Sequence, residues 1–351
     1  MSEKMFGYLE VHAVDHCNNN CRWCNNHSPF APEVEYQAEQ YIPWMDILEK
    51  KGICFDMISV MGGEPFLHSD LVRFVYELRH RFPQKTMAIS SNGFWLGKET
   101  VDSYETLWKM TDILFVSLYP NLLRGVGGDH VVRSFLERIK KYNPRISIDA
   151  RSKQDFREIE YYDLPVEPGV FCGTSECTTL LADGRLARCG LGGYAHYNRH
   201  VGTAFRNSSQ MFFDLKADFS TGLFWNWRRR WPFDACYHCS SYQWKMSAWK
   251  VEKGTKRNLA TEIDHDMRAG ERLMALRKWE AAEALLRTVA DKDPSRGNVL
   301  NLLAVCVSRR SPAAAVAYLE KALAINPEDR AALENLAEVK RMLRLSPARS
   351  R

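Results

Sequence analysis

A chain of 351 residues, 45% of them hydrophobic, is long enough for two or three domains with their own cores. The formal net charge of +5 is mild, and the basic residues are scattered apart from Arg228-Arg229-Arg230, which argues against nucleic-acid binding. We find no N-terminal signal segment and no run of about twenty apolar residues that could span a membrane. Ten cysteines in such a chain favour metal ligation over disulfides and predict a cytoplasmic protein.

The first predicted strand, residues 8–15, leads into three closely spaced cysteines, Cys17, Cys21 and Cys24. This spacing can direct three thiolates at one iron–sulfur cluster and leave one iron without a protein ligand, where chemistry can take place. A zinc site is the alternative, because His27 lies three residues beyond Cys24 and could complete a knuckle of three thiolates and one imidazole. The triplet by itself leaves both metals open.

A second apolar run, residues 57–60, ends in Met61-Gly62-Gly63-Glu64-Pro65. CxxxCxxC after a first strand and Gly-Gly-Glu-Pro after a second resembles the radical S-adenosylmethionine (SAM) superfamily. The resemblance implies that the three cysteines hold a [4Fe–4S] cluster whose open iron binds the methionine end of SAM. It also implies that the glycine-rich motif holds the SAM amino group, and that an aromatic residue stands beside the last cysteine. The residues that it assigns to SAM in this region are Trp23, Gly62, Gly63 and Glu64.

Up to about residue 163, short apolar runs alternate with amphipathic stretches of helix length. The runs occupy residues 9–14, 57–61, 86–90, 113–118 and 146–150. This alternation predicts parallel β-α-β units, and so an α/β barrel or open sheet. By the resemblance, residues 1–165 are a partial (β/α)6 barrel, in which chemistry takes place at the carboxyl ends of the strands. Both motifs lie there, and so do Ser90 and Asn92.

Alternation along the strands predicts which side chains line the barrel interior. The inward set comprises Tyr8, Glu10, His12, Phe115, Ser117, Tyr119, Ser147, Asp149 and Arg151. This polar lining suits a hydroxyl-rich ligand together with SAM, although half of these residues could instead be ion-paired structural groups. By analogy with strand positions that the family uses, Ser117 and Arg151 are candidates for the SAM ribose and carboxylate. Glu10, His12 and Asp149 are the candidate bases for a substrate hydroxyl.

A second group of cysteines follows in residues 166–250: Cys172, Cys177, Cys189, Cys236 and Cys239. Its spacing resembles the twitch domain, the shortened form of the SPASM domain. The resemblance implies an auxiliary [4Fe–4S] cluster held by Cys172, Cys189, Cys236 and Cys239, and a four-thiolate zinc ribbon is the alternative. Cys177 is left over by spacing. It is a hydrogen-atom donor if it lies near the substrate, and otherwise a spare thiol or an alternative ligand.

Beyond a linker predicted over residues 251–263, the composition shifts to alanine, leucine and arginine, and Pro294 and Pro327 recur thirty-three residues apart. Residues 264–345 resemble two tetratricopeptide repeats with a closing helix at 331–343. Two repeats are too few to predict a solenoid that is stable by itself, so the tail is expected to pack against the rest of the enzyme. Repeats of this kind bind peptides or build oligomers; packing or self-association is at least as expected here as peptide capture.

Together these features predict a radical SAM oxidoreductase or epimerase with two [4Fe–4S] clusters and SAM. Residues 14–29 resemble radical SAM proteins that accompany saccharide biosynthesis, which implies a sugar or cyclitol substrate, free or nucleotide-linked. An external donor such as flavodoxin or ferredoxin is expected to supply electrons, with no nucleic-acid or membrane partner. Two alternatives stay open: modification of a peptide held by the repeat tail, and a non-enzymatic zinc-stapled adaptor, which leaves the Gly-Gly-Glu-Pro motif unexplained.

Overall fold

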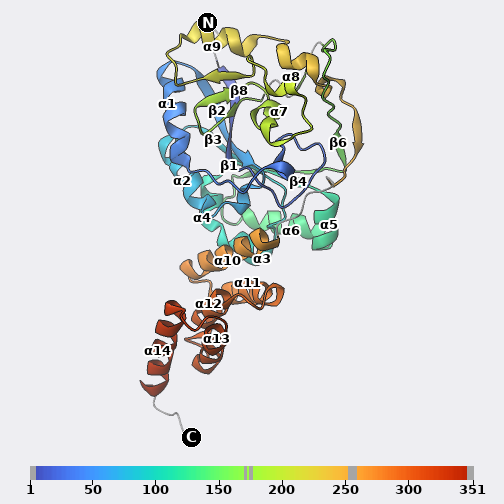
Figure 1. Cartoon of the computed structure of the whole chain (residues 1–351). Coiled ribbons are helices and arrows are strands. Elements are labelled where there is room, and N and C mark those ends of the chain that lie inside the picture. The colour runs from blue at the N-terminus through green and yellow to red at the C-terminus, as the bar shows by residue number, and fades with distance from the viewer. Residues whose placement is uncertain (1–4, 170–171, 174–176, 252–258, 346–351) are drawn as a thin grey trace. The chain divides into compact units, whose positions relative to one another are not determined.

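The computed structural model describes residues 5–169, 172–173, 177–251 and 259–345 (Figure 1). The chain divides into two compact units. The first contains residues 1–94 and 106–258, and the second contains residues 95–105 and 259–351. Within the described residues, none of the helices has both the length and the apolar character needed to cross a membrane.

The first unit is built on an eight-stranded sheet with the order β5-β4-β3-β2-β1-β7-β8-β9. Its strands are β1 (Met5–Val14), β2 (Cys54–Gly62), β3 (Thr86–Ser91), β4 (Ile113–Leu118), β5 (Ser147–Ser152), β7 (Thr179–Leu180), β8 (Arg185–Ala187) and β9 (Phe212–Asp214). β1 to β5 are parallel neighbours, so their carboxyl ends meet at one edge. β7 extends this parallel set on the other side of β1, and β8 and β9 follow as antiparallel strands.

Helices connect the parallel strands and cover the outer side of the sheet, as α1 and α2 show in Figure 1. The helices of this unit are α1 (Ile42–Lys50), α2 (Leu71–Arg81), α4 (Glu105–Met110), α5 (Pro120–Val126), α6 (Asp129–Ile139), α7 (Gly190–Gly193), α8 (Thr203–Arg206) and α9 (Thr221–Arg229). In α2 the residues at helical spacing, Leu71, Phe74 and Leu78, are buried. Asp70 caps this helix by accepting a hydrogen bond from the backbone N–H of Arg73 at 3.0 Å.

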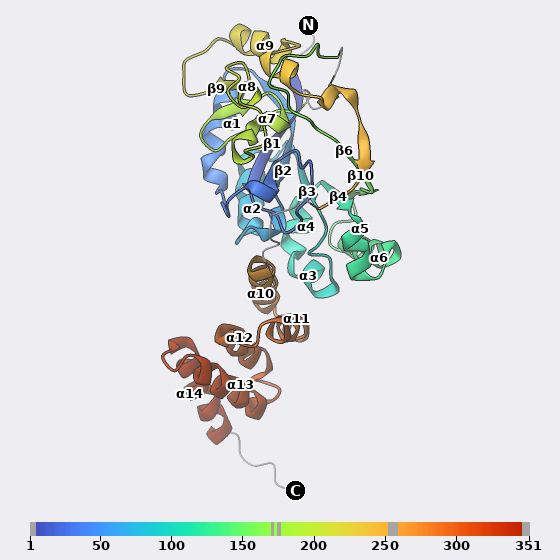
Figure 2. The ribbon, with the colours of Figure 1, turned by 45° about the vertical axis from the view of Figure 1, so that its right-hand side comes forward.

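The expected six strands of the partial barrel are corrected to five in residues 1–165. After β5 the chain forms only the short strand β6 (Asp155–Arg157), which pairs antiparallel with β10 (Met246–Ala248) and not with the main sheet. Figure 2 shows this two-stranded ribbon beside the parallel strands. The physical reason is local: the segment that follows β5 is polar and then contains Pro165 and Pro168, so it offers neither a crossover helix nor another apolar strand.

The second unit is all helical. It contains α3 (Lys98–Ser103), α10 (Leu259–Ala275), α11 (Trp279–Lys292), α12 (Gly297–Val307), α13 (Pro312–Ile325) and α14 (Arg330–Leu345). Its core includes Leu273, Leu286, Leu303 and Leu319, one from each of the four helices α10 to α13. The closing helix expected at 331–343 lies within α14. In the described part of the tail, α10 to α14 fit two helical pairs and a closing helix, while the tetratricopeptide assignment stays a prediction.

Two boundaries differ from the expected ones. Residues 95–105 group with the helical tail, because the Arg272 guanidinium lies 4.0 Å from the centre of the Tyr104 ring and Lys278 forms an ion pair with Glu105 at 2.8 Å. The linker expected at 251–263 ends earlier, since α10 begins at Leu259. Residues 252–258 of that linker lie outside the described residues.

Candidate active site

The three N-terminal cysteines line a cavity of about 440 Å³ at the carboxyl edge of the parallel sheet. Segments that follow β1, β2, β3, β4 and β5 all contribute to its wall, as expected where parallel strands end together. The lining includes Glu10, Cys17, Cys21, Cys24, Gly62, Gly63, Ser90, Asn92, Ser117, Lys153, Asp155, Arg157, Cys177 and Trp244. The site motifs, separate in the sequence, therefore open onto one space.

Hydrogen-bond donors surround the sulfur atoms of the triplet. Cys17 Sγ accepts from the backbone N–H of Asn19 at 3.3 Å and from Asn92 Nδ2 at 3.4 Å, and Cys21 Sγ accepts from Trp249 Nε1 at 3.2 Å. Burial, and then the charge of Cys24, raises the pKa of Cys21 to about 12. Three such thiols become thiolates together only beside strong positive charge, which the irons of a cluster supply. The donor set therefore fits a [4Fe–4S] cluster.

His27 does not face the triplet as a zinc ligand. Its Nε2 lies 3.0 Å from the carbonyl oxygen of Leu191, and its Nδ1 lies 3.3 Å from Asn198 Nδ2, so both ring nitrogens already have partners. Burial lowers the pKa of His27 to about 4, which keeps the ring neutral. Among the described residues, no three or more His, Cys, Asp or Glu side chains gather closely enough to hold a single metal ion. A cluster distributes its ligands over separate corners and does not need that geometry.

We expect the variant His27→Gln to bind as much iron as the wild-type chain, because neither nitrogen ligates metal. The neutral folded ring also makes wild-type stability fall as the pH drops from 6.5 towards about 4, since only the unfolded chain takes up the proton. The difference between wild type and variant across that pH range is expected to reach about 3 kcal/mol. Iron analysis and urea unfolding between pH 4 and 7 measure both effects. Loss of bound metal in His27→Gln would indicate that His27 is a metal ligand, as the zinc-knuckle alternative requires.

The two glycines of the Gly-Gly-Glu-Pro motif allow close packing of two backbone segments. A Cβ atom on Gly62 would overlap the carbonyl oxygen of Val14, and one on Gly63 would overlap that of His16. The backbone N–H of Gly63 donates to Val14 O at 2.9 Å, and that of Glu64 donates to His16 O at 3.0 Å. Gly62 also has a φ of 126°, which side chains disfavour. The motif thereby holds the loop that carries the cysteines against the end of β2.

Glu64 does not line the cavity, which corrects its expected place beside SAM. Its side chain is buried and accepts three hydrogen bonds: from Asn92 N at 2.7 Å, from Ser91 Oγ at 2.8 Å and from Phe66 N at 3.2 Å. Burial raises the pKa of Glu64 to about 7, although these donors oppose the shift. Glu64 is therefore a positioning residue that ties the end of β2 to the end of β3.

Glu64→Gln is expected to lower the free energy of unfolding by about 1–3 kcal/mol. Both carboxylate oxygens of Glu64 accept hydrogen bonds, so the NH₂ group of the glutamine would face a hydrogen-bond donor in either orientation of the amide. SAM binding is expected to weaken with it, since Asn92 is displaced from the cavity wall. Urea unfolding and isothermal titration of SAM measure these changes. Glu39→Gln is the matched control: Glu39 is exposed and pairs with Arg73 at 3.1 Å, so its loss is expected to cost less than about 1 kcal/mol. Equal stability of the two variants would contradict the role of Glu64.

The interior strand residues divide into two groups. Ser90, Asn92 and Ser117 line the cavity. Ser117 was expected on the inward face of β4, and Ser90 and Asn92 were expected at the carboxyl ends of the strands. Asp149 and Arg151 do not line it, which is a correction. Arg151 Nε donates to Asp149 Oδ1 at 2.8 Å, and the Arg151 side chain is 74% exposed, because β5 is the edge strand.

Two cations that the sequence analysis missed, Lys153 and Arg157, line the cavity instead. Lys153 lies two residues after Arg151, and alternate residues of an extended chain share a face. The pattern that predicted an inward Arg151 therefore also predicts an inward Lys153. Burial lowers the pKa of Lys153. Arg157 lies on β6 with its guanidinium carbon 3.4 Å from the centre of the Trp244 ring, and only the tertiary fold brings these two residues together.

His12 points away from the cavity wall, which corrects its expected role as a base. Its Nδ1 lies 2.8 Å from Asp15 Oδ1, and its ring stacks on Tyr194 with the centroids 3.8 Å apart. Asp15 also accepts hydrogen bonds from Tyr36 at 2.6 Å and from Tyr197 at 2.7 Å. These contacts bury His12 and leave it no route to a substrate. They join β1 to the segment that carries the second cysteine group.

Glu10 and Cys177 do line the cavity and lie close to each other. Thr179 Oγ1 donates to Glu10 Oε2 at 2.7 Å, and Cys177 Sγ lies 3.0 Å from the Tyr8 hydroxyl. Burial raises the pKa of Glu10. Burial, followed by the charge of Glu10, raises the pKa of the Cys177 thiol well above its usual range. Cys177 is therefore held as a neutral S–H group that faces the same space as the cysteine triplet.

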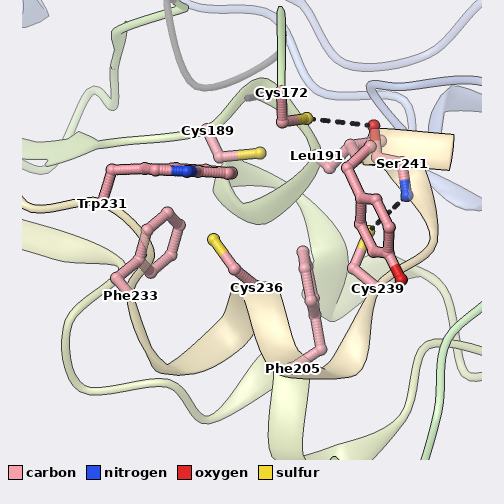
Figure 3. Close-up of a pocket in the computed structure, with 10 residues that line it drawn as sticks. Cys172, Cys189, Leu191, Phe205, Trp231, Phe233, Cys236, Cys239 and Ser241 are labelled. Carbon is pink, nitrogen blue, oxygen red and sulfur yellow. Dashed lines mark hydrogen bonds between the residues drawn. The ribbon is translucent and has the colours of Figure 1, made fainter. Parts of the chain in front are cut away.

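The remaining four cysteines of the second group, Cys172, Cys189, Cys236 and Cys239, line a separate pocket with aromatic and aliphatic neighbours. In Figure 3 they come from several segments, with Trp231 and Phe233 on one side. Ser241 lies near two of them: Cys172 Sγ is 3.5 Å from Ser241 Oγ, and Ser241 N donates to Cys239 Sγ at 3.4 Å. Burial raises the pKa of Cys236 to about 12. This apolar pocket fits a closed cluster better than four free thiolates.

Trp23 packs with this auxiliary region, which corrects its expected place beside SAM. Its side chain lies against the hydrophobic cluster that contains Cys189, Phe205 and Phe233, and its φ is 60°. The guanidinium carbon of Arg22 lies 4.6 Å from the centre of the Trp23 ring. Cys24, the next residue, lines the cavity, whereas Trp23 is not among the lining residues.

Residues 12–147 match the family model of the radical SAM superfamily. This part of the chain is a radical SAM domain, and such a domain implies a [4Fe–4S] cluster and SAM. The matched range contains the cysteine triplet, the glycine motif and the ends of β1 to β4, which are the segments that build the cavity.

Curated relatives share this domain at low identity. The GTP 3′,8-cyclase of Nautilia profundicola is 24% identical over 168 residues, which cover 46% of this chain and 52% of that protein. The GTP 3′,8-cyclase of Helicobacter pylori strain HPAG1 is 25% identical over 142 residues, or 39% of this chain and 43% of that protein. The chain spans about half the length of the curated relatives it matches.

Two solved structures are also similar. BtrN in complex with AdoMet and 2-DOIA has 17% identity and a TM-score of 0.38, covering 54% of this chain and 75% of BtrN. Streptococcus suis SuiB bound to S-adenosylmethionine has 10% identity and a TM-score of 0.32, covering 64% of this chain and 68% of SuiB. At these scores the likeness adds no further assignment.

Proposed function

We propose that this chain is a radical SAM epimerase that removes a hydrogen atom from a carbohydrate-like substrate and returns one from Cys177. The observation that carries the proposal is the position of Cys177: it lines the cavity of the cysteine triplet, whereas the four other cysteines of its group line a separate pocket. A thiol placed there favours return of a hydrogen atom over net oxidation.

When bound, the cluster and SAM supply a 5′-deoxyadenosyl radical that takes a hydrogen atom from a substrate C–H bond. The Cys177 thiol then donates its hydrogen atom to the substrate carbon from the opposite face, which breaks the S–H bond and forms the new C–H bond. One electron and one proton restore the thiol. Glu10, whose pKa is raised by burial, is placed to supply the proton, and an auxiliary cluster in the four-cysteine pocket is the proposed source of the electron.

The lining of the cavity supports a polar substrate that carries an anionic group. Lys153 and Arg157 provide positive charge, Asp155 and Glu10 are the carboxyl groups beside them, and Ser and Asn side chains provide hydrogen-bonding groups. SAM carries one carboxylate, for which Lys153 is the new candidate in place of Arg151. Arg157, beside Trp244, then faces the substrate, and a phosphate group suits it. Because the matched relatives are named for GTP, nucleotide-linked sugars are the first substrates to test.

Deuterium transfer tests the proposal. The anaerobically reconstituted chain is given sugars, cyclitols and nucleotide-linked sugars labelled with deuterium at single carbons. We expect the label of one carbon to appear in 5′-deoxyadenosine, and in D₂O we expect the same carbon to gain one deuterium from the exchanged Cys177 thiol. A ketone product without solvent deuterium would indicate oxidation and contradict the proposed epimerisation.

A further inference from the structure

A buried arginine that has no acidic partner among the described residues lies beside the auxiliary pocket. Arg188 follows the last residue of β8, directly precedes Cys189 and is only 2% exposed. Its guanidinium carbon lies 5.2 Å from the centre of the Phe233 ring, which also lines the pocket of the four cysteines. Arg188 is thus packed against the same apolar wall that the thiols share.

Hydrogen bonds satisfy only part of the donor capacity of the Arg188 guanidinium. One terminal nitrogen donates to the carbonyl oxygen of Trp227, whereas Nε finds no hydrogen-bond partner in the part of the chain that the structure describes. Among the described residues, no carboxylate lies within ion-pair distance of Arg188. Arg228 and Arg230 add further positive charge to its surroundings, and Cys236 and Cys189 would act on it with negative charge as the thiolates that a cluster requires.

A charge buried without a counter-charge strongly disfavours the folded state, so a partner of opposite sign is expected. A [4Fe–4S] cluster with four thiolate ligands carries net negative charge and gains one more on reduction. Nearby charge is one of the factors that set the potential of such a cluster. The position of Arg188 therefore favours the reduced state over the oxidised state.

We propose that Arg188 is the buried counter-charge of the auxiliary cluster and raises its reduction potential. This inference rests on the auxiliary cluster of the proposed function. It makes the cluster easier to reduce by an external donor, and so keeps the electron that restores the Cys177 thiol available.

The test uses the full chain with Cys17, Cys21 and Cys24 replaced by alanine, so that only the auxiliary pocket can hold a cluster. Redox titration with dithionite, followed by electron paramagnetic resonance, gives the potential in this background and in its Arg188→Lys and Arg188→Met forms. Arg185→Met is the matched control, because Arg185 begins β8, the strand that Arg188 directly follows, is 39% exposed and pairs with Asp183 at 2.8 Å.

We expect Arg188→Met to shift the reduction equilibrium at least tenfold towards the oxidised form, a fall of about 59 mV for one electron, with a smaller fall in Arg188→Lys and none in Arg185→Met. Loss of the cluster in Arg188→Met but not in Arg188→Lys also supports the role of the charge. An unchanged potential at full iron content overturns it, and so does loss of the cluster in both variants, which would indicate packing alone. Absence of iron in the background chain itself would instead reject the auxiliary cluster.

Discussion

Replacing Cys177 by alanine is expected to reduce formation of the epimerised product by at least about 100-fold, the loss of roughly 2.7 kcal/mol or more of transition-state stabilisation. The reason is that the substrate carbon loses its only nearby S–H donor among the described residues of the cavity. Iron content and cleavage of SAM are expected to persist, because Cys177 does not line the auxiliary pocket and is not one of the three cysteines of the N-terminal triplet. Chromatography of product and of 5′-deoxyadenosine, with iron analysis, measures the three quantities.

Cys54→Ala is the control for this experiment. Cys54 begins β2, is half-buried and does not line the cavity, so we expect normal product formation in its absence. Retained epimerisation in Cys177→Ala would remove Cys177 from the reaction. A loss of iron in that variant would instead make it a cluster ligand, in place of Cys172.

Removing one cysteine from each group is expected to separate two iron–sulfur sites. The wild-type chain should bind about eight irons after anaerobic reconstitution, and Cys17→Ala and Cys236→Ala should each bind about four. Only Cys17→Ala should lose reductive cleavage of SAM. Cys17 lines the same cavity as Gly62 and Gly63 of the motif assigned to SAM, whereas Cys236 lines the auxiliary pocket. Product formation should fail in both variants.

Metal analysis also shows which results would contradict this prediction. Two zinc ions in place of iron, with no cleavage of SAM, would contradict both clusters. A full complement of eight irons in Cys236→Ala would contradict the auxiliary site alone and leave the first site standing. Cys306→Ala is the control for cysteine removal in general, because Cys306 is buried in the helical core of the second unit.

Local patterns were sufficient for the segments that carry the main site. The spacing of Cys17, Cys21 and Cys24 and the Gly62-Gly63 pair are short-range features, and the structure lines one cavity with all five residues. Alternation in β4 placed Ser117 inward, because a strand between two neighbours keeps its pleat. The same rule failed for Arg151 because β5 is an edge strand, where a long charged side chain reaches solvent.

Contacts between distant segments decided what the sequence could not. Tyr194 covers His12 and removes it from the candidate bases, and the β6–β10 ribbon brings Trp244 to Arg157. Packing of the auxiliary segment also separated Cys177 from the four cysteines that surround it in the sequence. The sequence by itself therefore determined the radical SAM motifs, whose spacing is set by covalent geometry and strand period. Only the tertiary structure decided which thiol lines the cavity and which buried charge lies beside the auxiliary pocket, because burial and partner choice depend on long-range packing.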